Sequence, residues 1–115
     1  MPTQIVNAPI SRNDLRMIAE QQFGDFVKAV VDVQRQLMAI GAELHADEEA
    51  VLLQEGSQQT DLWGVNLYVD QVGDDLIEFD SMINVRPSQG NRSRGVEDPV
   101  VQRLIRDIVG RLVGP

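Results

Sequence analysis

The loop from Arg86 to Arg94 concentrates the side chains best suited to bind an anion. Guanidinium groups, hydroxyls and backbone amides freed by glycine are the groups that hold phosphates and carboxylates. The loop lacks the GxxxxGK[ST] pattern, so it is not a Walker-type phosphate loop. Its candidate ligand-binding residues are Arg86, Ser88, Asn91, Arg92 and Arg94. The alternative is a connecting loop whose arginines pair with acidic residues nearby.

A second group, Glu43, His45 and Asp47, contains the only histidine in the chain. If a strand continues to Asp47, these three side chains at alternate positions project to one face. An imidazole with two carboxylates is a ligand set for a divalent metal ion, which lowers the pKa of a bound water and so supports hydrolysis. Two other roles compete with metal binding: Asp47 as the cap of a helix, and Glu43 in an ion pair.

Polar side chains also line one face of a predicted hairpin, formed by residues 60–70 and 76–87. These side chains are Asn66, Tyr68, Glu78, Asp80, Asn84 and Arg86. An outward polar face is expected of a half-buried antiparallel sheet and needs no function, although Asp80 and Arg86 would connect this face to the arginine loop. No nucleophile elbow, HExxH pattern or dinucleotide fingerprint occurs, so the sequence specifies neither a reaction nor a cofactor.

Three helices are predicted to position these residues. Ser11 caps the first helix, Asp47 caps the second, and Asp98 followed by Pro99 begins the third. Gly56 ends the second helix, because glycine readily adopts the left-handed conformation of a helix C-terminus. The apolar stripe of the third helix comprises Val101, Ile105, Ile108 and Leu112, widened by Leu104 and Val109.

Two further strands are predicted at residues 26–33 and 37–44, because valine favours a pleated surface. The turn between them, residues 34–36, contains no Gly, Asn or Asp, and a helix over 26–44 is the alternative. With the hairpin, the strands give an α+β fold of order α-β-β-α-β-β-α, in which helices pack on a largely antiparallel four-stranded sheet. Residues 1–10 form an extended N-terminal arm or an edge strand.

The length of 115 residues suits a single domain spanning residues 1–115. Aromatic residues are few, with three Phe, one Trp and one Tyr, so the core must be mainly aliphatic and a homo-oligomer would bury more surface. The chain has no cysteine and no apolar run of about 20 residues, and its first residues have neither the basic start nor the apolar segment that would predict a secretory signal. We therefore expect a cytoplasmic protein that does not cross a membrane.

The formal net charge of −8 argues against nucleic-acid binding, which depends on the neutralisation of phosphates. The charge is also unevenly distributed. Residues 1–85 contain 4 basic and 15 acidic side chains, whereas residues 86–115 contain 6 arginines and 3 acidic side chains. The simplest interpretation is that a basic C-terminal segment lies on an acidic body.

Three segments resemble a known family: GAELHADEEAVLLQEGS (41–57), DLWGVNLYV (61–69) and SMINVRPSQGNRSRGVEDP (81–99). Their combination is similar to a bacterial family catalogued only as a domain of unknown function, with short single-domain members. The similarity covers most of the chain from about Lys28 onward. The family tends to have a glycine near the position of Gln36, which implies a hairpin there. The resemblance implies no activity, cofactor or catalytic residue.

These features predict a small non-catalytic binding or interaction module. It would use the arginine loop to hold a small anionic ligand or an acidic protein, and it would form a homodimer. The alternative is a metal-dependent hydrolase with its site at Glu43, His45 and Asp47.

Overall fold

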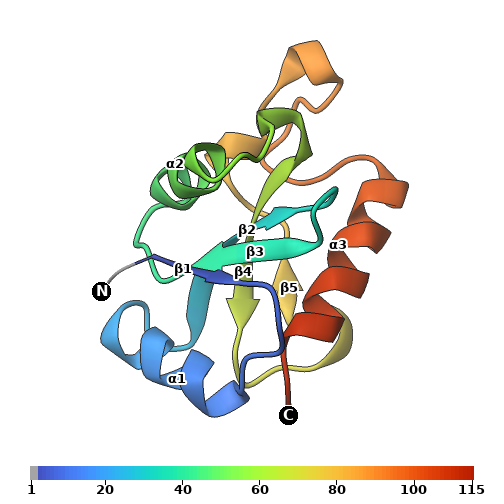
Figure 1. Ribbon diagram of the computed structural model, residues 1–115. Helices are drawn as coiled ribbons and strands as arrows, with labels where there is room; N and C mark the ends of the chain where they lie inside the picture. The colour runs from blue at the N-terminus through green and yellow to red at the C-terminus, as the bar shows by residue number, and fades with distance from the viewer. Residues whose placement is uncertain (1–2) are drawn as a thin grey trace.

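Three helices pack on the two faces of a five-stranded antiparallel sheet in the computed structural model of this chain, which describes residues 3–115 (Figure 1). The strands are β1 (Gln4–Val6), β2 (Phe26–Asp32), β3 (Leu37–Ile40), β4 (Leu62–Tyr68) and β5 (Ile77–Glu78), in the sheet order β1-β3-β2-β4-β5. The helices are α1 (Arg12–Gln21), α2 (His45–Gln54) and α3 (Pro99–Leu112). The predicted α+β class and antiparallel pairing are confirmed.

The N-terminal segment supplies the fifth strand. Residues 4–6 pair antiparallel with residues 38–40 of β3, and the Val6 side chain is buried in the core. The segment is therefore an edge strand, and the prediction of a four-stranded sheet beginning with a helix is wrong by one strand. Residues 1–2 of the predicted arm lie outside the described residues.

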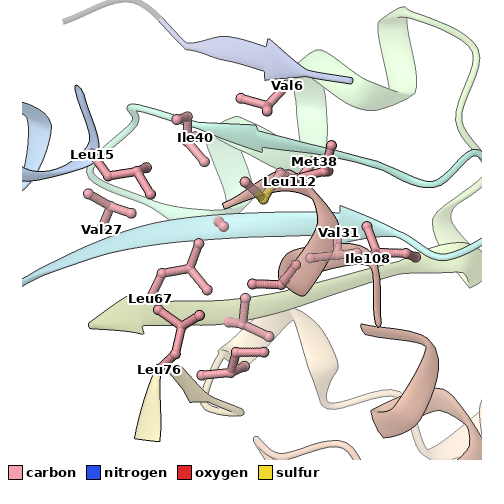
Figure 2. Packing of buried hydrophobic residues seen from close by; sticks show 14 of the residues in the cluster. Val6, Leu15, Val27, Val31, Met38, Ile40, Leu67, Leu76, Ile108 and Leu112 are labelled. Carbon is pink, nitrogen blue, oxygen red and sulfur yellow. The ribbon is translucent and has the colours of Figure 1, made fainter. Parts of the chain in front are cut away.

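Both faces of the sheet are buried, because β2 carries apolar side chains toward each of them. Val27, Ala29 and Val31 face α1 and α3, whereas Val30 faces α2. Figure 2 shows the larger of the two cores, in which Leu15 of α1 and Leu112 of α3 meet the side chains of the strands. The helices thus form one layer on each side of the sheet.

Helix α3 begins as the sequence predicts. The Asp98 side chain accepts a hydrogen bond from the amide of Val100, and Pro99 occupies the first turn. Ile105, Ile108, Val109 and Leu112 are buried against the sheet. Leu104 is 42% exposed, so its predicted place in the core is wrong. Within residues 3–115, no helix combines the length and apolar character that crossing a membrane requires.

The hairpin of β2 and β3 excludes the alternative of a helix over residues 26–44, and β3 ends earlier than predicted, at Ile40. The buried carboxylate of Asp32 supplies the turn chemistry that residues 34–36 lack. Its Oδ1 accepts hydrogen bonds of 2.9 Å from the amides of Gln34 and Arg35. Gln36 completes the turn in the left-handed region, with φ of 58°. A side chain before the turn therefore takes the role usually played by residues within it.

In the hairpin predicted from residues 60–70 and 76–87, the second strand is shorter than expected. β5 ends at Glu78, and the chain then forms a 3-10 helix at Met82–Asn84. The Asn84 side chain replaces the missing strand, because Oδ1 accepts from the Gly64 amide at 2.8 Å and Nδ2 donates to the Gly64 carbonyl at 2.9 Å. The predicted strand up to Val85 is wrong, since a side-chain amide satisfies the backbone of β4 there.

The left-handed conformation of Gln36 leads to a stability prediction. A side chain in this region costs about 1 kcal/mol that glycine avoids. Gln36→Gly should therefore raise the midpoint of thermal unfolding by about 3 °C, as measured by circular dichroism. Gln34→Gly, in the same turn but without a positive φ, should lower it. A lower unfolding temperature for Gln36→Gly would contradict this turn geometry.

Candidate functional site

The predicted metal-binding residues do not share the strand on which that prediction depended. β3 ends at Ile40 and α2 begins at His45, so Glu43, His45 and Asp47 are not alternate positions of one strand. The N-cap position of α2 belongs to Leu44, which makes no side-chain cap bond, and the prediction of Asp47 as the cap is wrong. Among residues 3–115, no group of three or more His, Asp or Glu side chains is arranged to hold a metal ion.

His45 instead packs against the sheet. Its Nε2 donates a hydrogen bond of 2.8 Å to the backbone carbonyl of Val65, and the side chain is buried. Burial lowers the pKa of His45, and the bond to Val65 opposes this change without reversing it. The imidazole is therefore neutral at pH 7 and serves as a donor to the backbone of β4.

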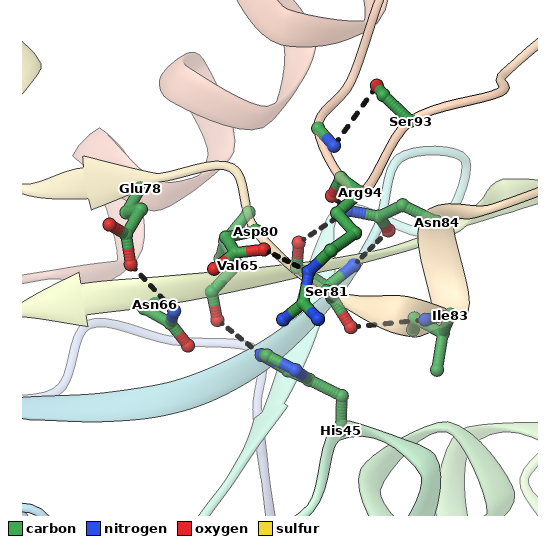
Figure 3. A network of polar contacts seen from close by, with 12 residues as sticks. His45, Val65, Asn66, Glu78, Asp80, Ser81, Ile83, Asn84, Ser93 and Arg94 are labelled. Carbon is green, nitrogen blue, oxygen red and sulfur yellow. Dashed lines mark hydrogen bonds and ion pairs between the residues drawn. The ribbon is translucent and has the colours of Figure 1, made fainter.

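The close approach of α2 to β4 depends on Gly64. A Cβ atom at this position would lie 2.5 Å from the Ser81 side chain and 3.2 Å from Cγ of His45. The missing side chain allows the start of α2 and the segment after β5 to meet over the same strand (Figure 3).

Arg86, one of the predicted anion ligands, holds two parts of the chain together. Its guanidinium donates hydrogen bonds to the carbonyls of Gln59 and Leu62, the latter at 2.7 Å. The same group lies 4.2 Å from the centre of the Trp63 ring, within cation–π distance. These contacts engage the guanidinium within the protein.

The amides of the arginine loop hold a carboxylate of the chain itself. Glu97 accepts hydrogen bonds from the amides of Arg92 (2.7 Å) and Ser93 (2.8 Å), and these bonds lower the pKa of Glu97. The Asn91 side chain closes the same loop, because its Oδ1 accepts from the Glu97 amide and its Nδ2 donates to loop carbonyls. The Glu97 carboxylate therefore occupies backbone amides that were predicted to bind a ligand.

Arg94 is the arginine of this loop that reaches the sheet. Its Nε lies 2.6 Å from Oδ1 of Asp80, and its side chain is 56% exposed. In Figure 3 the Arg94 guanidinium and the His45 ring lie on the same side of β4. Beyond the effect of burial, the charges of Lys28, Asp80 and Arg94 all act on the pKa of His45. His45, Asp80 and Arg94 therefore share one surface.

The remaining predicted ligands lie elsewhere. Ser88 belongs to the exposed 3-10 turn Pro87–Gln89, which projects beyond the sheet at the top of Figure 1, and the Arg92 side chain is also exposed. Of the predicted set, Arg86 and Asn91 are engaged in holding the fold, and Arg94 is the member whose charge acts on His45 at the start of α2.

Half of the sheet face beside α2 is not covered by that helix. Val30 is fully buried beneath α2, whereas Phe26 and Lys28, further back along the same face of β2, are partly exposed. The register of β2 with β4 places Asn66 and Tyr68 on the same face, and Asn66 donates to a carboxylate of β5. We call this part of the sheet surface the open half-face, and it consists of Phe26, Lys28, Asn66, Tyr68 and Glu78.

Lys28 is the candidate residue that the sequence patterns did not identify. It is the only lysine in the chain and lies between Val27 and Ala29, within the apolar part of β2. A single charged residue between apolar ones was the signal that the sequence contained. Strand periodicity alone, however, assigns such a residue to a face exposed to solvent. Its proximity to the start of α2 follows only from the tertiary structure.

Glu48 is a fully buried acid on the inner side of α2. Its Oε2 accepts a hydrogen bond of 3.2 Å from the amide of Ala42, while its Oε1 has no partner among the described residues. Burial raises the pKa of Glu48 to about 9, outweighing the opposite effect of the bond from Ala42. The carboxyl group is therefore protonated at pH 7 in the folded protein.

Glu48→Gln should remove a pH dependence of stability. The folded protein retains on Glu48 a proton that the unfolded chain releases above the ordinary pKa of 4.5. The free energy of unfolding should therefore fall as pH rises from about 5 toward 9, by up to about 1.4 kcal/mol per pH unit. Urea unfolding at several pH values in this range should show a steeper fall in the wild type than in Glu48→Gln, and the difference between the two slopes is the contribution of Glu48. Equal slopes in both proteins would exclude a neutral buried carboxyl.

Comparison with curated proteins finds no match, and comparison with solved structures finds none either. A family model described as "Protein of unknown function (DUF5674)" matches residues 4–112. This range includes the three segments whose resemblance to a domain of unknown function was noted in the sequence, and that resemblance is confirmed. Because the match covers almost the whole chain, the protein belongs to the DUF5674 family.

Proposed function

We propose that this protein is a non-catalytic binding module that holds an anionic group at the N-terminus of α2. The α2 anion site consists of the backbone amides of His45 and Ala46 together with the side chains of Lys28 and Arg94. The group bound is a phosphate or a carboxylate, carried by a small molecule or by an acidic protein. The lack of cysteine fits a reducing compartment, so the cytoplasm is the setting we propose for this binding.

The uncapped start of α2 is the observation that carries this proposal. α1 and α3 each begin with a side-chain cap, from Ser11 and Asp98, whereas Leu44 provides none for α2. The first amides of a helix point outward and carry partial positive charge, so they attract anions. Within residues 3–115, the amides of His45 and Ala46 donate to no backbone or side-chain acceptor.

Two cationic side chains lie around the same point. The charges of Lys28 and Arg94 both lower the pKa of His45, which supports a cationic environment at the first residue of α2. The ion pair with Asp80 uses only Nε of Arg94, so the two terminal nitrogens of the guanidinium remain available. A guanidinium held in this way suits the two-point contact that carboxylates and phosphates make with arginine. Asp80 therefore positions Arg94 for a ligand.

The alternative of a metal-dependent hydrolase receives no comparable support. Glu43 and Asp47 are both exposed, one before and one after the first residue of α2 in the chain, and His45 uses Nε2 to bind Val65. A binding role needs only the amides and cations described above. Of the predicted anion ligands, the proposal retains Arg94 and adds residues from β2 and α2.

Phosphate should stabilise the wild-type protein more than sodium chloride at the same ionic strength. Arg94→Ala and Lys28→Ala should each lose most of the phosphate-dependent rise in unfolding temperature, because each removes one of the two cations at the site. Differential scanning fluorimetry with phosphate, sulfate and citrate would measure these shifts. In a phosphate titration followed by amide NMR, the signals of His45 and Ala46 should move furthest.

Arg103→Ala is the matched control, since it removes the same charge from an exposed position on α3. It should retain the full phosphate effect. If Arg94→Ala behaves like Arg103→Ala, or if no anion moves the amide signals of His45 and Ala46, the proposed site is wrong.

A further inference from the structure

Three of the five aromatic side chains lie outside both apolar cores. They form a row made of Phe23, Phe26 and Tyr68. The rings of Phe23 and Phe26 stack with their centroids 4.7 Å apart, and the centroids of Phe26 and Tyr68 are 5.3 Å apart. Burial of aromatic rings contributes strongly to stability, so a protein with so few of them would be expected to use them inside. Their collection at the surface is typical of a binding site. These three residues are named the aromatic row.

The aromatic row extends across the open half-face. Phe26 and Tyr68 are register partners on β2 and β4, and Phe23 precedes β2 with its side chain 37% exposed. The two strands pair with each other at this position, beyond the residues at which β3 pairs with β2 and β5 pairs with β4. This pairing holds the Phe26 and Tyr68 rings side by side before a partner arrives, which limits the entropy lost on binding.

The aromatic row holds one cation of the chain itself. Nζ of Lys28 lies 5.1 Å from the centre of the Phe23 ring. The face of an aromatic ring attracts cations through its quadrupole, and this contact shows that a cation fits at one end of the row. Phe26 lies between Phe23 and Tyr68, so Tyr68 forms the other end.

Acidic groups surround that other end. The Tyr68 hydroxyl donates a hydrogen bond of 3.3 Å to Oε1 of Glu78. Burial, followed by the negative charges of Glu78, Asp25 and Asp80, raises the pKa of Tyr68. Residues 1–85 as a whole also carry a net negative charge, with 15 acidic and 4 basic side chains. Both the local and the overall charge therefore favour a cationic partner.

We propose that the aromatic row, together with Glu78, is a docking surface for an arginine- or lysine-bearing segment of a partner protein. The cationic group of the partner stacks on the aromatic rings and pairs with the Glu78 carboxylate. Lys28 competes with it, because this side chain covers Phe23 and carries the same charge. The surface is distinct from the α2 anion site and shares only Lys28 with it.

The test uses a short fluorescein-labelled arginine-rich peptide and fluorescence anisotropy at low salt. Phe23→Ala and Glu78→Gln should each weaken binding about two- to fivefold, the size of one exposed cation–π contact or ion pair. Lys28→Met should bind the peptide more tightly, because it removes the competing cation. The same variant should lose phosphate binding at the α2 anion site, so the two proposals respond to it in opposite directions and can fail separately.

Matched controls are Glu55→Gln, an exposed acid at the end of α2, and Val100→Ala, an exposed apolar residue of α3. Both should bind the peptide as the wild type does. Phe23 lies outside the helices and strands, and circular dichroism would check that every variant keeps its fold. If the wild type, Phe23→Ala and Glu78→Gln bind the peptide with equal affinity, the peptide is attracted only by the net negative charge of the protein, and the proposed docking surface is wrong. Tighter binding of an oligothymidylate or an acidic peptide to the row would likewise overturn the proposal.

Discussion

The outer edge of β4 at Gly64 is the constraint on which the candidate site depends. Gly64 pairs with Val30 of β2 on its inner side, but β5 pairs with β4 only at residues 66–67, so the outer edge of Gly64 has no strand beside it. A buried amide or carbonyl left without a partner costs about 1–3 kcal/mol, and the Asn84 side chain satisfies both groups. The missing Cβ then lets Ser81 and His45 approach the strand together. The start of α2 and the arginine loop lie side by side because Gly64 has no side chain and because Asn84 binds its backbone amide and carbonyl.

The parts of the fold that could be predicted from the sequence are those decided locally. Asp98 and Pro99 identify the start of α3, because capping involves neighbouring residues only. The predictions that failed involved partners distant in the chain. Residues 4–6 become a strand because β3 offers them an edge, and the second strand of the later hairpin stops early because Asn84 replaces it. Periodicity describes which face a residue prefers, but it does not identify its neighbour.

The candidate site was predictable only in part, for a related reason. The concentration of arginines located the loop, yet composition could not show that Glu97 fills its amides or that Arg86 binds the carbonyls beside Trp63. Of the predicted anion ligands, Arg94 is the one that lies near the start of α2. Lys28 was overlooked because its neighbours are apolar strand residues. It becomes a candidate because α2 leaves it partly exposed and its charge acts on His45.

The buried carboxylate of Asp32 bears on the order in which the chain folds. Besides the turn amides, it accepts a hydrogen bond of 2.7 Å from the hydroxyl of Ser57, 25 residues further along and just beyond α2. Arg35 donates to the same hydroxyl and to the carbonyl of Glu55. Closing a loop of this length costs little chain entropy, and the loop contains both β3 and α2. We therefore expect β2, β3 and α2 to assemble around Asp32 as one unit early in folding.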